Sequence, residues 1–299
     1  MQTPARAAPV PVIVVGNIVV GGAGKTPTVI ALVQALQEAG HRPGVLSRGH
    51  GRVGSEMREV APDSAASLVG DEPLLIHRRT GVPVWVDRDR LAAAAALCAH
   101  HPEVNVLVCD DGLQHHALAR VADVVVFDDR GVGNGLLLPA GPLRQPLPTT
   151  LPARTWVLYT GTQASTALPG GMAARSLGRL WPLADWWKGR AQGSRALAEL
   201  HGQPVLAAAG LAAPEKFFAM LEAAGLSLQR LPQPDHASYD TLPWPAGQTQ
   251  YILVTEKDAV KLQPGRPGNE HVGVVPLDFD LPPELVRGLL KLLPRHPSP

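Results

Sequence analysis

The sequence has little cysteine, few aromatic residues and no excess of either charge, and each shortage excludes a class of protein. The two cysteines, Cys98 and Cys109, both lie in apolar runs, so we expect reduced core thiols of a cytosolic protein and no disulfide framework. With 27 basic and 26 acidic residues, the net charge of +1 gives no global attraction to nucleic acid. No apolar run reaches the roughly 18 residues that a bilayer-spanning helix needs.

Short apolar runs alternate with amphipathic stretches in the first half of the chain. Runs that are apolar at every position belong to parallel strands covered on both faces, so this order predicts an α/β fold with a doubly wound, mostly parallel sheet. The strands are expected at 10–15, 43–47, 82–86, 104–109 and 121–127. The helices are expected at 26–39, ended by Gly40, and at 88–100, with Asp87 as N-cap.

A segment rich in glycine, proline and leucine, 134–152, predicts a long loop or hinge. A second α/β set follows it, with strands expected at 155–159, 205–209, 251–254 and 273–277 and helices at 214–225, from 257 and at 283–293. The sequence therefore predicts two domains, a nucleotide-binding domain over 1–150 and a smaller α/β domain over 151–299.

The strongest chemical signal is a glycine-rich turn between the first strand and the first helix. Backbone N–H groups of such a turn cradle phosphates, the lysine neutralises the β- and γ-phosphates, and the threonine hydroxyl binds Mg²⁺. Val19 stands where the usual motif has its first glycine, but the strand–GGAGKT–helix context is intact. The motif predicts a P-loop NTPase-type fold that binds ATP through Gly21, Gly22, Ala23, Gly24, Lys25, Thr26 and Pro27.

Acidic residues stand at several junctions between strands and helices. Asp110 and Asp111 end an apolar strand, where an acid of a P-loop protein holds Mg²⁺; an N-cap pair is the alternative. Asp71 and Glu72 open a helical stretch, where residue type alone favours capping. The pairs Asp128-Asp129 and Asp235-His236 are typical of loops, and in Thr255–Asp258 the acids would cap a helix while Lys257 reaches across a cleft.

Two enzyme classes use GGxGKT. Partitioning-type ATPases, which act as partner switches, carry an additional lysine before the glycine pair, and this chain has Val20 there. Small-molecule kinases are the other class, and Val20 favours them without identifying the acceptor.

Seven motifs in order resemble the tetraacyldisaccharide 4'-kinase family of lipid A synthesis over most of the chain. They are NIVVGGAGKTP (17–27), SRG (47–49), GDEP (70–73), DDGLQH (110–115), LPAGPLR (138–144), Asp235-His236 with Tyr239, and TEKDAVK (255–261). The resemblance implies transfer of the ATP γ-phosphoryl group to the 4'-hydroxyl of a tetraacylated glucosamine disaccharide 1-phosphate, giving lipid IVA at the cytoplasmic face of the bacterial inner membrane.

The resemblance also implies roles for individual residues. Asp71 would be the general base and His236 its partner, one from each domain, so that closure of the smaller domain assembles the site with Lys25. Thr26, Glu72, Asp110 and Asp111 would surround Mg²⁺, the expected cofactor beside ATP.

The expected partners are the acylated lipid and a membrane surface, with neither nucleic acid nor an obligatory protein partner. Family members usually begin with a hydrophobic helix that this sequence lacks, so we expect weak peripheral contact or a soluble chain. Gln145 replaces the glutamate that usually follows the arginine of PLR. An interfacial patch of Trp181, Trp186 and Trp187 with Arg179, Lys188 and Arg190 would supply the contact; core packing is the favoured alternative.

Overall fold

The computed structural model describes residues 5–189 and 193–294 and divides them into two units. The first unit contains the described residues up to Ser64, Leu68–Arg175 and those from Phe279 onward. The second unit contains Ala65–Ser67 and Ser176–Asp278. In the described part of the chain, no helix combines the length and the apolar character needed to cross a membrane.

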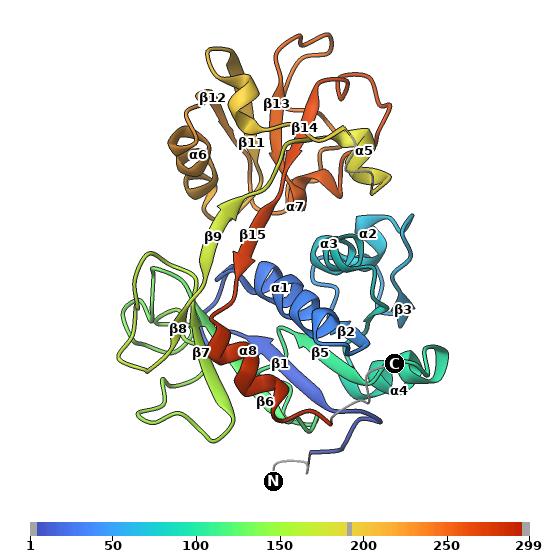
Figure 1. The fold of residues 1–299 in the computed structure, drawn as a ribbon, viewed down its shortest axis with the longest axis vertical. Coiled ribbons are helices and arrows are strands. Elements are labelled where there is room, and N and C mark those ends of the chain that lie inside the picture. The colour runs from blue at the N-terminus through green and yellow to red at the C-terminus, as the bar shows by residue number, and fades with distance from the viewer. Residues whose placement is uncertain (1–4, 190–192, 295–299) are drawn as a thin grey trace. The chain divides into compact units, whose positions relative to one another are not determined.

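An eight-stranded sheet forms the first unit, in the order β3-β4-β2-β5-β1-β6-β7-β8 (Figure 1). Its strands are β1 (Val12–Gly16), β2 (Pro43–Ser47), β3 (Arg58–Glu59), β4 (Val84–Val86), β5 (Val106–Asp110), β6 (Ala122–Phe127), β7 (Thr155–Tyr159) and β8 (Gly171–Met172). Every pair is parallel except β3 with β4. The predicted doubly wound, mostly parallel α/β sheet is confirmed.

Helices cover the two faces of this sheet around β1. They are α1 (Lys25–Glu38), α3 (Asp71–Thr80), α4 (Arg90–His100) and α8 (Pro283–Leu290), and a short α2 (Ala66–Val69) precedes α3. The helix α1 contacts β1, β5 and α8, whereas α4 packs Ala93 and Leu97 with Val12 and Val14 of β1. Because β1 is buried at every position, both of its faces are covered, as the uniformly apolar runs predict.

One predicted cap is wrong by two residues. The carboxylate of Asp89 accepts hydrogen bonds from the backbone N–H groups of Leu91 and Ala92, so Asp89 is the N-cap of α4. The predicted cap, Asp87, accepts a hydrogen bond from the N–H of Asp89 at 2.6 Å and so holds the capping residue.

The predicted end of the first helix, α1, is found where expected. Gly40, just after the C-terminal end of α1, has φ 82°, a conformation that glycine adopts without strain, and the chain turns there.

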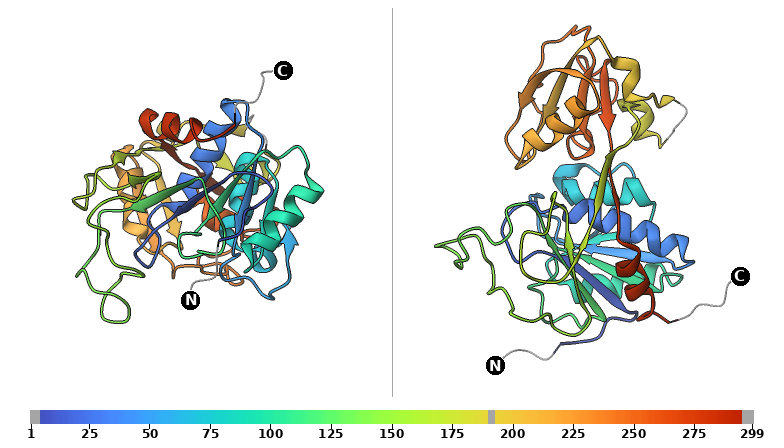
Figure 2. Two further views of the ribbon diagram at one scale, coloured as in Figure 1. Left: turned by 90° about the horizontal axis from the view of Figure 1, so that it is seen from below. Right: turned by 60° about the vertical axis from the view of Figure 1, so that its left-hand side comes forward.

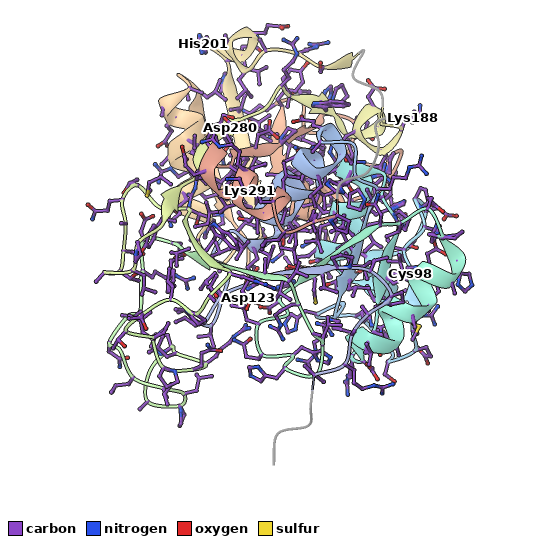
Figure 3. All side chains as sticks on the ribbon, turned by 60° about the horizontal axis from the view of Figure 1, so that its bottom comes forward. Cys98, Asp123, Lys188, His201, Asp280 and Lys291 are labelled. Carbon is purple, nitrogen blue, oxygen red and sulfur yellow. The ribbon has the colours of Figure 1, made fainter. Side chains whose placement is uncertain are left out.

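Loops cover one face of β6 and β7, whereas Gly288 of α8 packs against Trp156 on the other face of β7. Figure 2 shows the loops that follow β6, in green to yellow-green, standing out from the sheet. Their leucines Leu143 and Leu168 pack in one core with Phe127 and Tyr159. A cavity of about 470 Å³ remains between the face of β6 and these loops, with Asp123 in its wall (Figure 3). The predicted long loop over 134–152 contains only isolated bridges and is confirmed.

The second unit is built on a smaller sheet in the order β10-β14-β13-β11-β12. Its strands are β10 (Trp181–Pro182), β11 (Pro204–Ala209), β12 (Ser227–Pro232), β13 (Ile252–Thr255) and β14 (Val272–Val275). Its helices are α5 (Leu183–Trp187), η2 (Leu197–Leu200), α6 (Pro214–Ala223) and α7 (Glu256–Ala259). The strands β9 (Ala174–Leu177) and β15 (Leu277–Asp280) pair with each other where the chain passes between the units.

The predicted boundary at residue 150 falls inside the first unit. Strand β7, which we expected to open the second domain, pairs along its whole length with β6 and so extends the first sheet. The last helix, α8, also belongs to the first unit. Both elements are ordinary apolar strand and helix patterns, and only their pairing partners decide which sheet they join.

Candidate active site

The phosphate-binding loop connects the central strand β1 to the N-terminus of α1. Gly21 and Gly24 have φ values of 90° and 85°, which residues with a side chain rarely adopt. A Cβ at Gly24 would lie 3.1 Å from both Thr160 and Phe279, so space as well as conformation requires glycine there. The loop therefore turns its backbone N–H groups toward the start of a 14-residue helix, where an anion is stabilised.

Lys25, the first residue of α1, is held across this loop by Asn17. Its ammonium group donates to Asn17 Oδ1 at 3.1 Å and to the Gly21 carbonyl at 3.5 Å. Asn17 is fully buried and also donates from Nδ2 to the Gly21 carbonyl at 3.0 Å. Asn17 thus fixes both the loop and the lysine; it lies inside the motif 17–27, but its residue type alone gave no reason to assign it this role.

Two further side chains hold the loop from outside the motif, and sequence reasoning missed both. Thr160, directly after β7, donates from Oγ1 to the Ala23 carbonyl at 2.8 Å. Arg130 donates from Nη2 to the Gly22 carbonyl at 3.0 Å, and the carboxylate of Asp128 binds its Nε at 2.9 Å. Asp128 therefore orients an arginine, in agreement with its interpretation as a loop residue. No local pattern at Thr160 or Arg130 indicates a contact with a loop more than a hundred residues away.

Asp110 lies beside the phosphate loop because β5 is the neighbour of β1. The register places Asp110 next to Val15, at the strand end from which the loop begins. Its Oδ2 accepts from Ser47 Oγ at 3.3 Å, while its buried Oδ1 has no hydrogen-bond partner. Burial, followed by the nearby charge of Asp111, raises the pKa of Asp110 to about 7. A buried carboxylate oxygen without a partner is the feature expected of a residue that faces a cation.

Asp111 lies between two cations, and its predicted role at a metal stays a prediction. Arg144 Nη1 donates to its Oδ1 at 3.0 Å, and Lys25 Nζ lies 3.6 Å from the same oxygen. Arg144 also donates to Gln114 Oε1 at 3.3 Å, and Gln114 donates from Nε2 to Gln145 Oε1 at 3.2 Å. Gln145, which carries no charge, acts here as a hydrogen-bond acceptor.

The predicted metal ligands fit a magnesium ion that depends on the nucleotide for part of its coordination. In the described ranges, no three acidic, histidine or cysteine side chains lie close enough to hold a metal alone. Mg²⁺ usually takes one or two carboxylates together with phosphate oxygens and waters. Asp110 supplies the unpartnered oxygen, Thr26 follows Lys25 at the start of α1, and the charge of Glu72 contributes to the raised pKa of Asp110.

The motifs SRG and GDEP meet through their glycines. Gly70 has φ 98° and ψ 150°, and a Cβ there would lie 3.1 Å from the Cα of Gly49. This close approach of two backbones positions the start of α3. Asp71 is its first residue after the N-cap Gly70, so its carboxylate lies at the favourable end of the helix dipole.

In the second unit, His236 belongs to a small cluster of charged groups. Lys257 Nζ donates to Asp235 Oδ1 at 3.1 Å and to His236 Nε2 at 3.2 Å, an arrangement that places the proton of a neutral His236 on Nδ1. Lys257 thus contacts this loop within its own unit. Asp71 and His236 lie in different units, so their pairing stays a prediction.

The motif TEKDAVK builds the support for this loop. Thr255 is the N-cap of α7 and also donates from Oγ1 to Asp258 Oδ2 at 2.6 Å. Asp258 is fully buried; it accepts from the Gly210 N–H at 3.1 Å and lies 3.7 Å from Lys261 Nζ. Burial raises the pKa of Asp258. Tyr239 is buried beside this network, with Lys261 Nζ 5.3 Å from its ring centre, whereas Asp235 and His236 of the same motif are exposed.

The tryptophan cluster is core packing, and its interpretation as an interfacial patch is wrong. Trp186 is buried and donates from its indole N–H to Glu256 Oε1 at 3.0 Å. Trp187 donates to the Leu262 carbonyl at 2.8 Å and packs edge-on against Trp186. Trp181 is half-buried in β10, and Arg190 lies outside the described residues.

A glycine-rich loop from the central strand, a lysine at the helix start and an acid on the adjacent strand define a P-loop nucleotide-binding protein. A sequence profile of the tetraacyldisaccharide-1-P 4'-kinase family matches residues 2–294. The chain belongs to this family.

Relatives and a solved structure agree with this assignment. The chain is 57% identical over 295 residues to the tetraacyldisaccharide 4'-kinase of Leptothrix cholodnii, covering 97% of this chain and 84% of the relative. It is 53% identical over 294 residues to that of Methylibium petroleiphilum, covering 96% and 82%. The crystal structure of LpxK from Aquifex aeolicus in complex with ATP superposes with a TM-score of 0.78 at 26% identity, covering 97% of this chain and 91% of that one.

Proposed function

We propose that this protein is an ATP-dependent kinase that transfers the γ-phosphoryl group to the 4'-hydroxyl of a tetraacylated disaccharide 1-phosphate, a step of lipid A synthesis. The observation that carries the proposal is the position of Lys25 and Asp110 on either side of the phosphate loop, in a chain of this family. A partitioning-type ATPase has no comparable support, since Val20 donates its backbone N–H to Pro142 and supplies no second lysine.

The residues of the first unit would bind the nucleotide. The loop and the first turn of α1 consist of Gly21, Gly22, Ala23, Gly24, Lys25, Thr26 and Pro27. Lys25 would neutralise the β- and γ-phosphates. Mg²⁺ would be held by Thr26, Asp110 and Glu72, with Asp111 nearby, and would neutralise charge on the phosphates. Burial disfavours the charged form of Asp110, and a bound cation would favour it. The raised pKa therefore suits a carboxylate that becomes charged when Mg²⁺ binds together with the nucleotide.

Asp71 would act as the general base. The bond between the 4'-oxygen and phosphorus forms as the bond from phosphorus to the β-phosphate oxygen breaks; the hydroxyl proton passes to the Asp71 carboxylate and ADP leaves. His236 would position and tune Asp71 after the second unit closes over the first. The start of α3 supports this role by position, because the close approach of Gly70 to Gly49 fixes the backbone directly before Asp71.

The acceptor is a lipid, so we propose that the enzyme works peripherally at the cytoplasmic face of the inner membrane.

Transfer of label from γ-³²P ATP tests the function. Label should appear in a chloroform-extractable product when the tetraacylated disaccharide is supplied in detergent micelles. Release of labelled inorganic phosphate without labelled lipid would favour the partner-switch ATPase and contradict the kinase assignment.

A further inference from the structure

One surface loop exposes three consecutive leucines. Residues 131–142 (GVGNGLLLPAGP) contain no charged side chain. Within them Leu136, Leu137 and Leu138 are 52%, 46% and 53% exposed, while the next leucine, Leu143, is buried. We refer to residues 134–141 as the leucine tip. In the loops around the tip, Leu143 and Leu168 are buried and Leu147 and Leu151 are partly buried against the core, so the exposure of the three leucines in the tip is not a property of the whole region.

The leucine tip is rigid because its polar groups bond to one another. The Leu138 N–H donates to the Leu143 carbonyl at 2.9 Å and the Gly141 N–H to the Leu137 carbonyl at 3.0 Å. The side chain of Asn134 closes the tip by donating to the Ala140 carbonyl at 3.0 Å and accepting from the Leu136 N–H at 3.2 Å. Backbone groups paired within the loop lower the cost of moving it out of water.

The base of the leucine tip is joined to the segment between β1 and the glycine-rich turn of the phosphate loop. The Val20 N–H donates to the Pro142 carbonyl at 2.9 Å, and the Arg144 N–H donates to the Ile18 carbonyl at 2.7 Å. Val19 and Leu143 form an antiparallel bridge between these two bonds. Any surface that binds the tip is therefore held at a fixed place relative to the nucleotide site.

We infer that the leucine tip inserts into the boundary between headgroups and acyl chains of a phospholipid bilayer and holds the phosphate loop at the lipid surface. This inference rests on the proposed function, because a lipid acceptor places the reaction at such a surface. Exposed apolar side chains gain free energy by entering the acyl boundary, and no charged group in the tip opposes this. A protein partner is disfavoured, since a stable interface buries roughly 800 Å² per partner and three half-exposed leucines supply far less.

Co-sedimentation with vesicles of phosphatidylethanolamine and phosphatidylglycerol tests the inference. The variant L136S/L137S/L138S should partition at least ~10-fold less than the parent protein, since three leucine side chains are lost from the acyl boundary. The matched control V53S/L68S/M172S replaces three other exposed apolar residues, 68%, 40% and 40% exposed, and should partition like the parent. Equal losses in both variants, or no vesicle binding by the parent, would overturn the inference.

A direct probe covers the case in which the serine variant fails to fold. The fluorescence of a tryptophan placed at the tip by Leu137→Trp should be quenched by brominated acyl chains. The fluorescence of a tryptophan placed at position 53 by Val53→Trp should not be quenched. Absence of quenching at position 137, or concentration-dependent dimerisation lost only in L136S/L137S/L138S, would show that the tip contacts water or another protein and would overturn the inference.

Kinase activity in detergent micelles separates the inference from the proposed function. If L136S/L137S/L138S keeps its activity in micelles but loses vesicle binding, both are supported. Vesicle binding by a parent protein without kinase activity would overturn the proposed function alone.

Discussion

Arg144 and Asp111 form an ion pair that lies next to Lys25 of the phosphate loop. Arg144 Nη1 lies 3.0 Å from Asp111 Oδ1, and Lys25 Nζ lies 3.6 Å from the same oxygen. The Asp111 carboxylate is thus shared between Arg144 and Lys25, and a cation at position 144 reduces its pull on the lysine.

Removal of Arg144 should therefore weaken nucleotide binding. In Arg144→Gln the Asp111 carboxylate turns to Lys25, and we expect KM for ATP to rise ~3–10-fold, the effect of about one charge-assisted hydrogen bond. The double variant Arg144→Gln/Asp111→Asn should recover part of this loss, because the two residues are in contact. Additive losses in steady-state kinetics would show that Asp111 acts independently of Arg144.

Lys25→Ala should abolish transfer, because it removes the cation expected to neutralise the β- and γ-phosphates. We expect kcat/KM to fall at least ~10²-fold, since positioning and electrostatics supply most of the rate in phosphoryl transfer. The control is Lys291→Ala, an exposed lysine just after α8 (Figure 3). Parent-like turnover in Lys25→Ala would contradict the assignment of the phosphate loop.

Asp71 and His236 should act as one unit. If they form a dyad, the double variant Asp71→Ala/His236→Ala is hardly worse than the more damaged single variant, since members of a catalytic unit are strongly non-additive. Initial rates at saturating ATP measure this. Multiplying losses would instead assign His236 to a separate task, such as gripping the sugar.

The metal-free protein should lose stability as pH rises through the pKa of Asp110. Burial raises this pKa from 3.8 to about 7, so its contribution is fully present below pH ~4 and lost by pH ~7. Asp110→Asn should therefore raise the free energy of unfolding by ~2–4 kcal/mol more at pH 8 than at pH 4, at about 1.4 kcal/mol per pKa unit. Denaturant titration without Mg²⁺ checks this, with the exposed Asp63→Asn as the control that should show no such difference.

The two glycines at the ends of α3 should differ in their tolerance of alanine. Gly81, after the helix, has φ 68° and open space for a Cβ, so Gly81→Ala should cost about 1 kcal/mol. Gly70 combines φ 98° with a Cβ position 3.1 Å from the Gly49 backbone, so Gly70→Ala should cost ~2–4 kcal/mol. Thermal unfolding compares them. Because Gly70 positions Asp71, activity should also fall in Gly70→Ala alone; equal stability losses would remove the argument for close approach.

The sequence alone determined the phosphate loop and the class of fold. The residues of the motif are contiguous: Gly21 and Gly24 adopt conformations that need glycine, and Lys25 follows them at the start of the helix. The strands are apolar at every position, and this pattern belongs to a parallel sheet covered on both faces, whatever the distant partners are.

The tertiary structure decided what depends on partners far apart in the chain. Strand β7 reads like any apolar strand, and only its pairing with β6 assigns it to the first sheet and moves the unit boundary past residue 150. Tryptophans beside basic residues fit a membrane surface as well as the favoured core packing, and the indole of Trp186 against Glu256 decides for the core. Arg144 donates a hydrogen bond to Asp111, 33 residues away in the sequence, and Thr160 donates one to the carbonyl of Ala23, 137 residues away. Composition and periodicity record which residues are buried, whereas the identity of each partner is fixed only when the strands take their order in the sheet.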